Sequence, residues 1–155
     1  MKNILRIKKD GDTMRFNGLE NILSELVFDL KPASETPVNA VSFELTTFDF
    51  SEKNNSKWIE LISHYLTIAK VFEIHCWNEE LEWIELALQF GKLKDDDWKY
   101  GKIIVGDVTP QFTDMLLGQS KPTDTEFDNK MTPFFNVFLD DNFQSCHYGT
   151  ENYHR

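Results

Sequence analysis

The chain has 155 residues, of which 41% are hydrophobic and 14% aromatic, and it carries a formal net charge of −10 at pH 7. This length suits one hydrophobic core and is too short for two ordinary domains, while thirteen phenylalanines argue against disorder. The negative charge disfavours nucleic acid and anionic membranes as partners, so we expect one globular domain over residues 1–155 that binds neither.

The sequence carries no pattern typical of membrane insertion or export. Its apolar runs, such as IIV and LVF, are only a few residues long, so we expect no membrane span. Near the start, Arg6, Lys8 and Lys9 stand where a secretory signal needs an unbroken apolar region. We therefore expect a cytoplasmic protein in which Cys76 and Cys146 are reduced thiols.

The first quarter of the chain predicts a hairpin, a helix and a strand. Residues 3–16 contain two strand-like runs around Asp10 and Gly11, a pair favoured in tight turns. Residues 18–30 place leucine, isoleucine and valine at helical spacing. The two prolines of 31–37 predict a loop, and the β-forming residues of 38–48 predict a long strand.

Strands and helices alternate through the middle of the chain. Ser56 is expected to cap a helix over 57–70, and the sequence VFEIHCW, residues 71–77, predicts a strand. Asn78 is expected to cap the next helix, which would end near Gly91 and turn three apolar side chains toward the core: Leu81, Ile84 and Leu88.

The last third of the chain predicts a strand, a helix and a hairpin. Residues 102–108 form the strand, and Thr109 with Pro110 begins a helix that stops at Gly118. After a surface loop over 119–133, residues 134–139 and 143–149 predict a β-hairpin, followed by a frayed tail. This order indicates a single α/β or α+β domain, with a mixed β-sheet packed by three to four helices and a C-terminal β-hairpin.

Sequence signatures of catalysis are absent, and we expect no cofactor, no metal and no catalytic residue. The chain lacks glycine-rich phosphate loops, Gly-x-Ser-x-Gly, His-Glu-x-x-His and Cys-x-x-Cys. The adjacent pairs His75–Cys76 and Cys146–His147 lie in predicted strands, where neighbouring side chains point to opposite faces. Each pair can contribute one residue to a shared site. The sequence therefore does not exclude a nucleophilic cysteine paired with a histidine from another strand, such as Cys76 with His147.

Carboxylates and aromatic residues form the other notable clusters. Asp95, Asp96 and Asp97 follow one another, and Asp140 is followed by Asp141. Residues 73–128 carry thirteen Asp and Glu against five Lys. Such groups suit contact with cationic side chains, because arginine binds carboxylates through two parallel hydrogen bonds. Trp83 and Trp98 stand among these acids, a composition typical of protein interfaces.

The chain resembles the small immunity proteins of bacterial contact-dependent growth inhibition and related polymorphic toxin systems. The resemblance lies in the length, the acidity, the phenylalanine and tryptophan content, and a closing segment, FFNVFLDDNFQSCHYGTENY, similar to the final hairpin of some such proteins. It implies a cognate toxin domain as the partner, often a nuclease, that the immunity protein binds and blocks.

The leading hypothesis is therefore a non-enzymatic immunity protein that neutralises a basic toxin domain in the cytosol through an acidic surface. One alternative is a metal-dependent hydrolase that uses Asp95–Asp97 or Asp140–Asp141 with a histidine, and another is an acidic regulatory or adaptor module. The predicted partner-binding residues are Glu79, Glu80, Trp83, Asp95, Asp96, Asp97, Trp98, Asp140 and Asp141.

Overall fold

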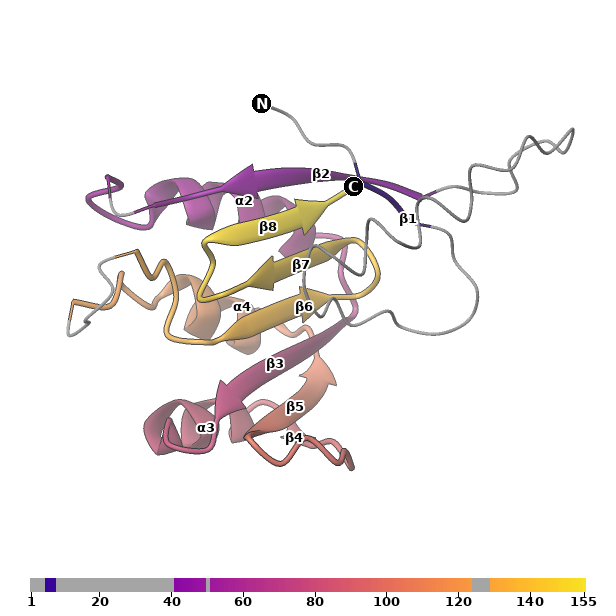
Figure 1. Cartoon of the computed structure of the whole chain (residues 1–155). Helices are drawn as coiled ribbons and strands as arrows, with labels where there is room; N and C mark the ends of the chain where they lie inside the picture. Colours follow the sequence, from indigo (N-terminus) through magenta and orange to yellow (C-terminus); the bar gives the residue numbers. More distant parts are fainter. Residues whose placement is uncertain (1–4, 8–40, 50, 124–128) are drawn as a thin grey trace, which may run out of the picture.

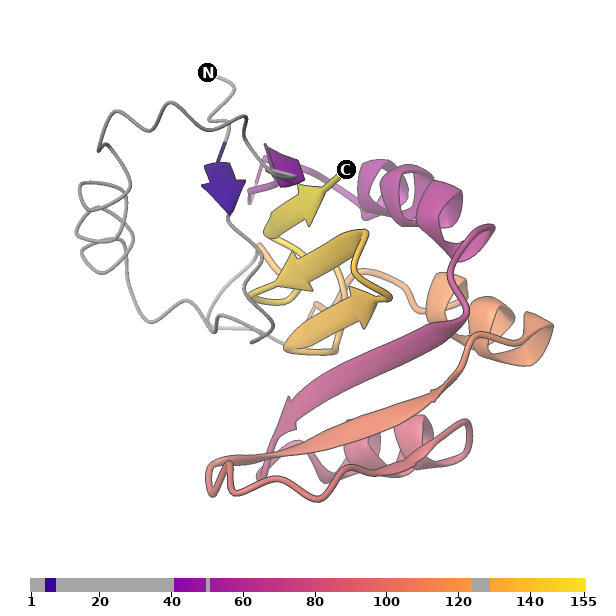
Figure 2. The same cartoon turned by 90° about the vertical axis from the view of Figure 1, so that its right-hand side faces the viewer.

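A computed structural model describes residues 5–7, 41–49, 51–123 and 129–155. They form a single α+β domain, an eight-stranded sheet with three described helices on one of its faces (Figures 1 and 2). The elements are β1 (Leu5–Ile7), β2 (Val41–Thr47), α2 (Ser56–Leu66), β3 (Val71–Trp77), α3 (Leu81–Leu88), β4 (Lys92–Leu93), β5 (Gly101–Asp107), α4 (Pro110–Leu117), β6 (Asn136–Leu139), β7 (Phe143–Cys146) and β8 (Glu151–His154). Of the hairpin predicted over 3–16 only β1 is described, and it pairs with β2; the rest of that hairpin, the helix predicted over 18–30 and the loop over 31–37 lie outside the described residues.

The strand order is β1-β2-β8-β7-β6-β3-β5-β4, and every described pair is antiparallel. The single α+β domain is confirmed, but within the described pairs the sheet is antiparallel rather than mixed. The chain leaves β3 through α3 and enters β4, which is parallel to β3 in direction but not its neighbour. The turn after the short β4 reverses the chain direction. Strand β5 therefore runs back between β3 and β4 and is antiparallel to both.

Strand β3 divides its side chains between the two faces of the sheet, as its sequence predicts. Phe72, Ile74 and Cys76 are buried on the face that carries the helices. The alternate residues, including Glu73 and His75, point to the opposite face and are only partly buried. The predicted separation of His75 from Cys76 is therefore confirmed.

The core fills the space between the helices and this inner face of the sheet. Helix α2 contributes Trp58 and Ile62, and α4 contributes Phe112, whose ring stacks on Phe72 with centroids 3.8 Å apart. Thr109 accepts a hydrogen bond from Phe112 N, as expected of the predicted cap of α4. Burial of these large side chains provides the main driving force for folding, at about 1.5–3 kcal/mol each.

Helix α3 differs from its prediction. It begins at Leu81 rather than after Asn78, whose side chain donates to Lys99 O instead. With eight residues it buries only the narrow stripe of Ile84 and Ala87. Leu81 and Leu88 were expected in the core, and this is wrong: both are exposed. In α2, Ser56 is the first helical residue and not the cap.

The C-terminal hairpin of β6 and β7 is confirmed, but the predicted frayed tail is wrong. Residues 151–154 form β8, which pairs with β7 on one side and β2 on the other. Its buried side chains are Asn152 and His154, so hydrophobic alternation could not reveal this strand. Figure 1 shows it in yellow between β2 and β7, inside the sheet rather than at its edge.

Candidate partner-binding surface

The two cysteines are packed thiols. Cys76 is fully buried under the helices and Cys146 is mostly buried on the other face of the sheet, so they do not share a site. Burial raises the pKa of both Cys76 and Cys146 to about 12, with nearby Glu80 and Glu151 adding to the effect. Both remain protonated at neutral pH, a state that does not favour nucleophilic attack.

Two histidines have both ring nitrogens in hydrogen bonds. Asn136 donates to His75 Nδ1 at 3.2 Å, so His75 Nε2 donates to Glu73 Oε1 at 2.6 Å. That hydrogen bond from His75 lowers the pKa of Glu73 more than its burial raises it. His154 lies between Tyr65 OH and Thr46 Oγ1, at 3.0 and 2.8 Å. These imidazoles hold strands and helices together and have no ring nitrogen left for a ligand.

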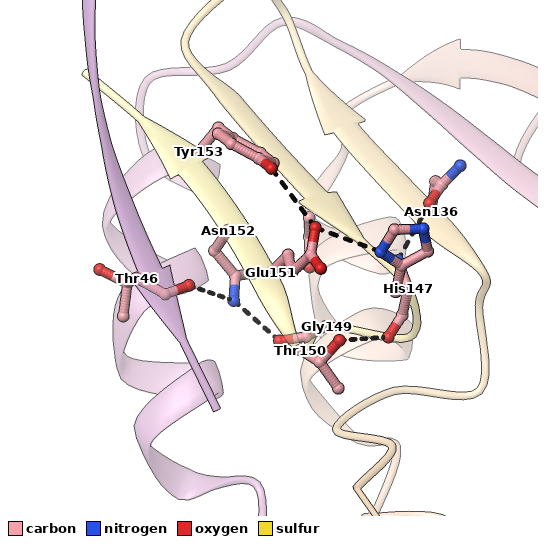
Figure 3. Close-up of polar contacts among 9 residues, drawn as sticks. Thr46, Asn136, His147, Gly149, Thr150, Glu151, Asn152 and Tyr153 are labelled. Carbon is pink, nitrogen blue, oxygen red and sulfur yellow. Dashed lines mark hydrogen bonds and ion pairs between the residues drawn. The ribbon is translucent and has the colours of Figure 1, made fainter. Parts of the chain in front are cut away.

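The turn before β8 carries the remaining residues of the cysteine–histidine segment. His147, Tyr148 and Gly149 all adopt positive φ, at 50°, 59° and 84°. Figure 3 shows His147 turned toward Glu151, with 3.2 Å between Nδ1 and Oε2, and Asn152 donating to Gly149 O. Within the described residues, no three His, Cys, Asp or Glu side chains are grouped so that they could hold a metal ion.

Several of the predicted partner-binding residues have internal partners. Glu80 Oε2 accepts from Trp77 N at 2.9 Å and Glu80 Oε1 accepts from Tyr148 OH at 2.6 Å. Asp96 accepts from Trp98 N. The carboxylate of Asp140 accepts from the backbone N–H groups of residues 70 and 71. These three acids hold turns and strand ends in place, a role that charge patterning along the sequence does not reveal.

The two predicted tryptophans are half-buried and pack on the domain itself. Trp83 of α3 meets Phe134 edge to face, with 6.2 Å between ring centroids. Trp98 lies against Trp77 at 5.3 Å, on the sheet face opposite the helices. A side chain at Gly101 would collide with the Trp98 ring, so glycine there permits this close packing. Neither ring is an exposed anchor.

The predicted acidic residues divide between opposite ends of the sheet. Asp140 N donates to Val71 O at the first residue of β3, and Asp141 follows it in the same turn. Glu79 and Glu80 follow Trp77, the last residue of β3. Seven strand residues separate these ends by about 20 Å. Asp140 and Asp141 therefore do not join the other acids in one patch.

Helix α3, strand β4 and the turn after β4 carry a surface that is both acidic and apolar. Tyr100 O accepts from Asn78 N at 3.0 Å, which joins the start of α3 to the turn between β4 and β5. Leu81, Glu85 and Leu88 recur at i, i+4 and i+7 along one side of α3. We call this region the α3–β4 surface, defined by its exposed residues Glu79, Leu81, Glu82, Glu85, Leu88, Leu93, Asp95, Asp97 and Tyr100.

The carboxylates of the α3–β4 surface have no partner in the part of the chain that the structure describes. Among the residues that the structure describes, none donates to or forms an ion pair with Glu79, Glu82, Glu85, Asp95 or Asp97. Beside them Leu81 is 66% exposed, Leu93 51% and Tyr100 58%. Of the acids of this surface, the sequence singled out Glu79, Asp95 and Asp97 but not Glu82 or Glu85. It also missed the apolar residues, because Leu81 and Leu88 fit a core-facing helical stripe equally well.

In the described residues, no helix is long and apolar enough to cross a membrane. Comparison with known proteins adds no relative: no family model, no curated protein and no solved structure matches the chain.

Proposed function

We propose that the protein is a non-enzymatic immunity protein that binds a basic toxin domain in the cytoplasm and neutralises it through the α3–β4 surface. The observation that supports this proposal is that α3, β4 and the turn after β4 expose leucine and tyrosine side chains beside five carboxylates that have no partner among the described residues. Exposed apolar groups among charges of one sign are typical of a surface that binds a partner of opposite charge.

The physical basis of binding has two parts. A nuclease or another domain that acts on a polyanion carries a positive surface, so the net charge of −10 accelerates encounter with it over long range. Leu81, Leu88 and Tyr100 would then lose contact with water in the complex, which slows dissociation. The glutamates between the leucines would pair with lysine and arginine of the partner.

The proposed function is tested by measuring binding to the C-terminal domain encoded by the gene immediately upstream. We expect a complex that charge reversal on α3, Glu82→Lys with Glu85→Lys, weakens by about 100-fold, the effect of removing close charge pairs in an interface. The matched control is Asp107→Lys with Asp114→Lys, which changes the net charge equally at exposed positions on β5 and α4.

The outcomes separate the function from its surface. Absence of a complex with the wild-type protein would refute the proposed function. A complex that both double variants weaken equally would retain the function and reject the α3–β4 surface, since only the net charge would matter. A second pair, Asp95→Lys with Asp97→Lys, tests the β4–β5 turn in the same way.

A further inference from the structure

Strand β4 is the last strand in the sheet order and has one neighbour among the described strands. Lys92 lies opposite Val105, and Lys94 N donates to Ile103 O at 2.8 Å. In an antiparallel ladder, residues alternate between bonding to the neighbouring strand and pointing away from it. Leu93 stands between Lys92 and Lys94, so its N–H and C=O groups point away from β5.

Some of the devices that protect a sheet edge are missing at β4. Edges are often blocked by proline, by a bulge, by lysine side chains or by keeping the edge strand very short, and of these β4 has its two-residue length and its lysines. The sequence around β4, GKLKDDDW, contains no proline. Lys94 is held by Glu73, with 3.0 Å between Nζ and Oε2, and does not guard the edge. Lys92 is the one lysine left to do so, and Leu93 beside it is 51% exposed.

From this geometry we propose that the toxin domain adds an extended basic segment to β4 as a ninth strand of the sheet. This inference rests on the proposed function. Backbone bonds to Leu93 give the segment its direction and register. Asp95 and Asp97, which follow directly, are placed to pair with lysine or arginine of the added strand, and Leu93 offers an apolar contact.

Charge favours this occupant over a second copy of the chain. Two copies joined through β4 would each bring Asp95, Asp96 and Asp97 to the joint, and each carries a net charge of −10. Like charges facing each other across paired strands are destabilising. A basic segment turns the same carboxylates into attractive partners.

The test compares Leu93→Pro with Leu93→Ala in binding to the upstream-encoded domain. Proline removes the outward N–H, and its ring obstructs an added strand, while the ladder bonds of Lys92 and Lys94 remain. Alanine removes the side chain and keeps the backbone donor. We expect Leu93→Pro to bind at least about tenfold more weakly than Leu93→Ala. Equal affinities of the two variants for the domain would refute the proposal that a strand is added to β4.

Hydrogen exchange on the wild-type protein gives a readout that does not depend on the folding of a variant. We expect the Leu93 amide to exchange rapidly in the free protein and slowly in the complex. A complex in which that amide stays unprotected would overturn the added strand but retain the proposed function. If the wild-type protein forms no complex, the proposed function fails, and the added strand fails with it.

Discussion

At the scale of single residues, burial of polar side chains is the feature that hydrophobicity could not predict. Asn152 is fully buried, and its amide donates to Gly149 O at 2.7 Å and Thr46 O at 3.3 Å. Its Oδ1 accepts from Ser145 OH, whose oxygen accepts from Trp58 Nε1. This network satisfies every member and joins α2, β2, β7 and the 147–149 turn, so it fixes how four separate parts of the chain meet.

Replacement of Asn152 by leucine is expected to destabilise the domain by about 3 kcal/mol. The change keeps a side chain of similar size but leaves two carbonyls and the Ser145 hydroxyl with fewer partners in a dry environment, at about 1–3 kcal/mol for each group left unsatisfied. Urea denaturation measures the loss. The control is Asn54→Leu at an exposed position with one local bond to Ser56 N, where we expect less than about 1 kcal/mol. Equal losses at the two positions would contradict the role of the network.

At the scale of secondary-structure elements, β8 decides the architecture. It consists of four residues, Glu151–His154, yet it lies between β2 and β7 and completes their pairing. Among the described strands, β8 is the one that links β2 to the part of the sheet that begins at β7. A strand of this kind is stabilised by its two neighbours rather than by its own sequence, since β-propensity reflects the surroundings more than the residue.

Deletion of residues 151–155 is therefore expected to abolish cooperative folding. The truncated chain loses two strand pairings together with the buried Asn152 and His154, a loss that exceeds the few kcal/mol by which small domains are stable. Thermal melting followed by circular dichroism is the measurement. Arg155→Ala is the control, because it keeps the backbone bonds of Arg155 to Asn142 and Tyr65 and loses only a contact with the Phe43 ring. A sigmoidal melt of the truncated chain near the wild-type temperature would contradict this role of β8.

At the scale of the whole molecule, acidic residues lie near both ends of β3. The Trp77 end of this strand leads into α3 and its exposed glutamates, and the Val71 end meets Asp140, whose carboxylate accepts hydrogen bonds from backbone N–H groups. The acids at the two ends therefore differ in kind. Glu79, Glu82 and Glu85 have no partner among the described residues, while Asp140 belongs to a turn.

The negative charge is expected to make association with the proposed partner depend strongly on salt. The association rate constant should fall by about tenfold or more between roughly 0.05 and 0.5 M NaCl, because screening shortens the reach of the attraction. The dissociation rate constant, governed by buried apolar contacts, should change far less. Stopped-flow or surface-plasmon-resonance kinetics separate the two, and an association rate constant unaffected by salt would contradict electrostatic steering.

The elements that could be predicted from the amino-acid sequence are those whose signals are local. Strand β3 alternates in hydrophobicity over residues 71–77, and α4 carries Thr109, Pro110 and Gly118 at its two ends. Turn residues 140–142 defined the β6–β7 hairpin. Strand parity also placed His75 and Cys76 on opposite faces. Each of these inferences depends on residues a few positions apart, which the chain keeps near one another in any fold.

Which polar residues are buried, and which apolar residues are exposed, depends on contacts between distant parts of the chain. His154 is buried in a strand because Thr46 and Tyr65, 108 and 89 positions away, satisfy its two nitrogens. Glu80 turns inward because Tyr148, 68 positions later, donates to it. A polar group becomes stable in the interior only when distant partners meet it, and local sequence does not contain that information. The same holds for Leu81 and Leu88, which are exposed because α3 turns Ile84 and Ala87, rather than these leucines, toward the core.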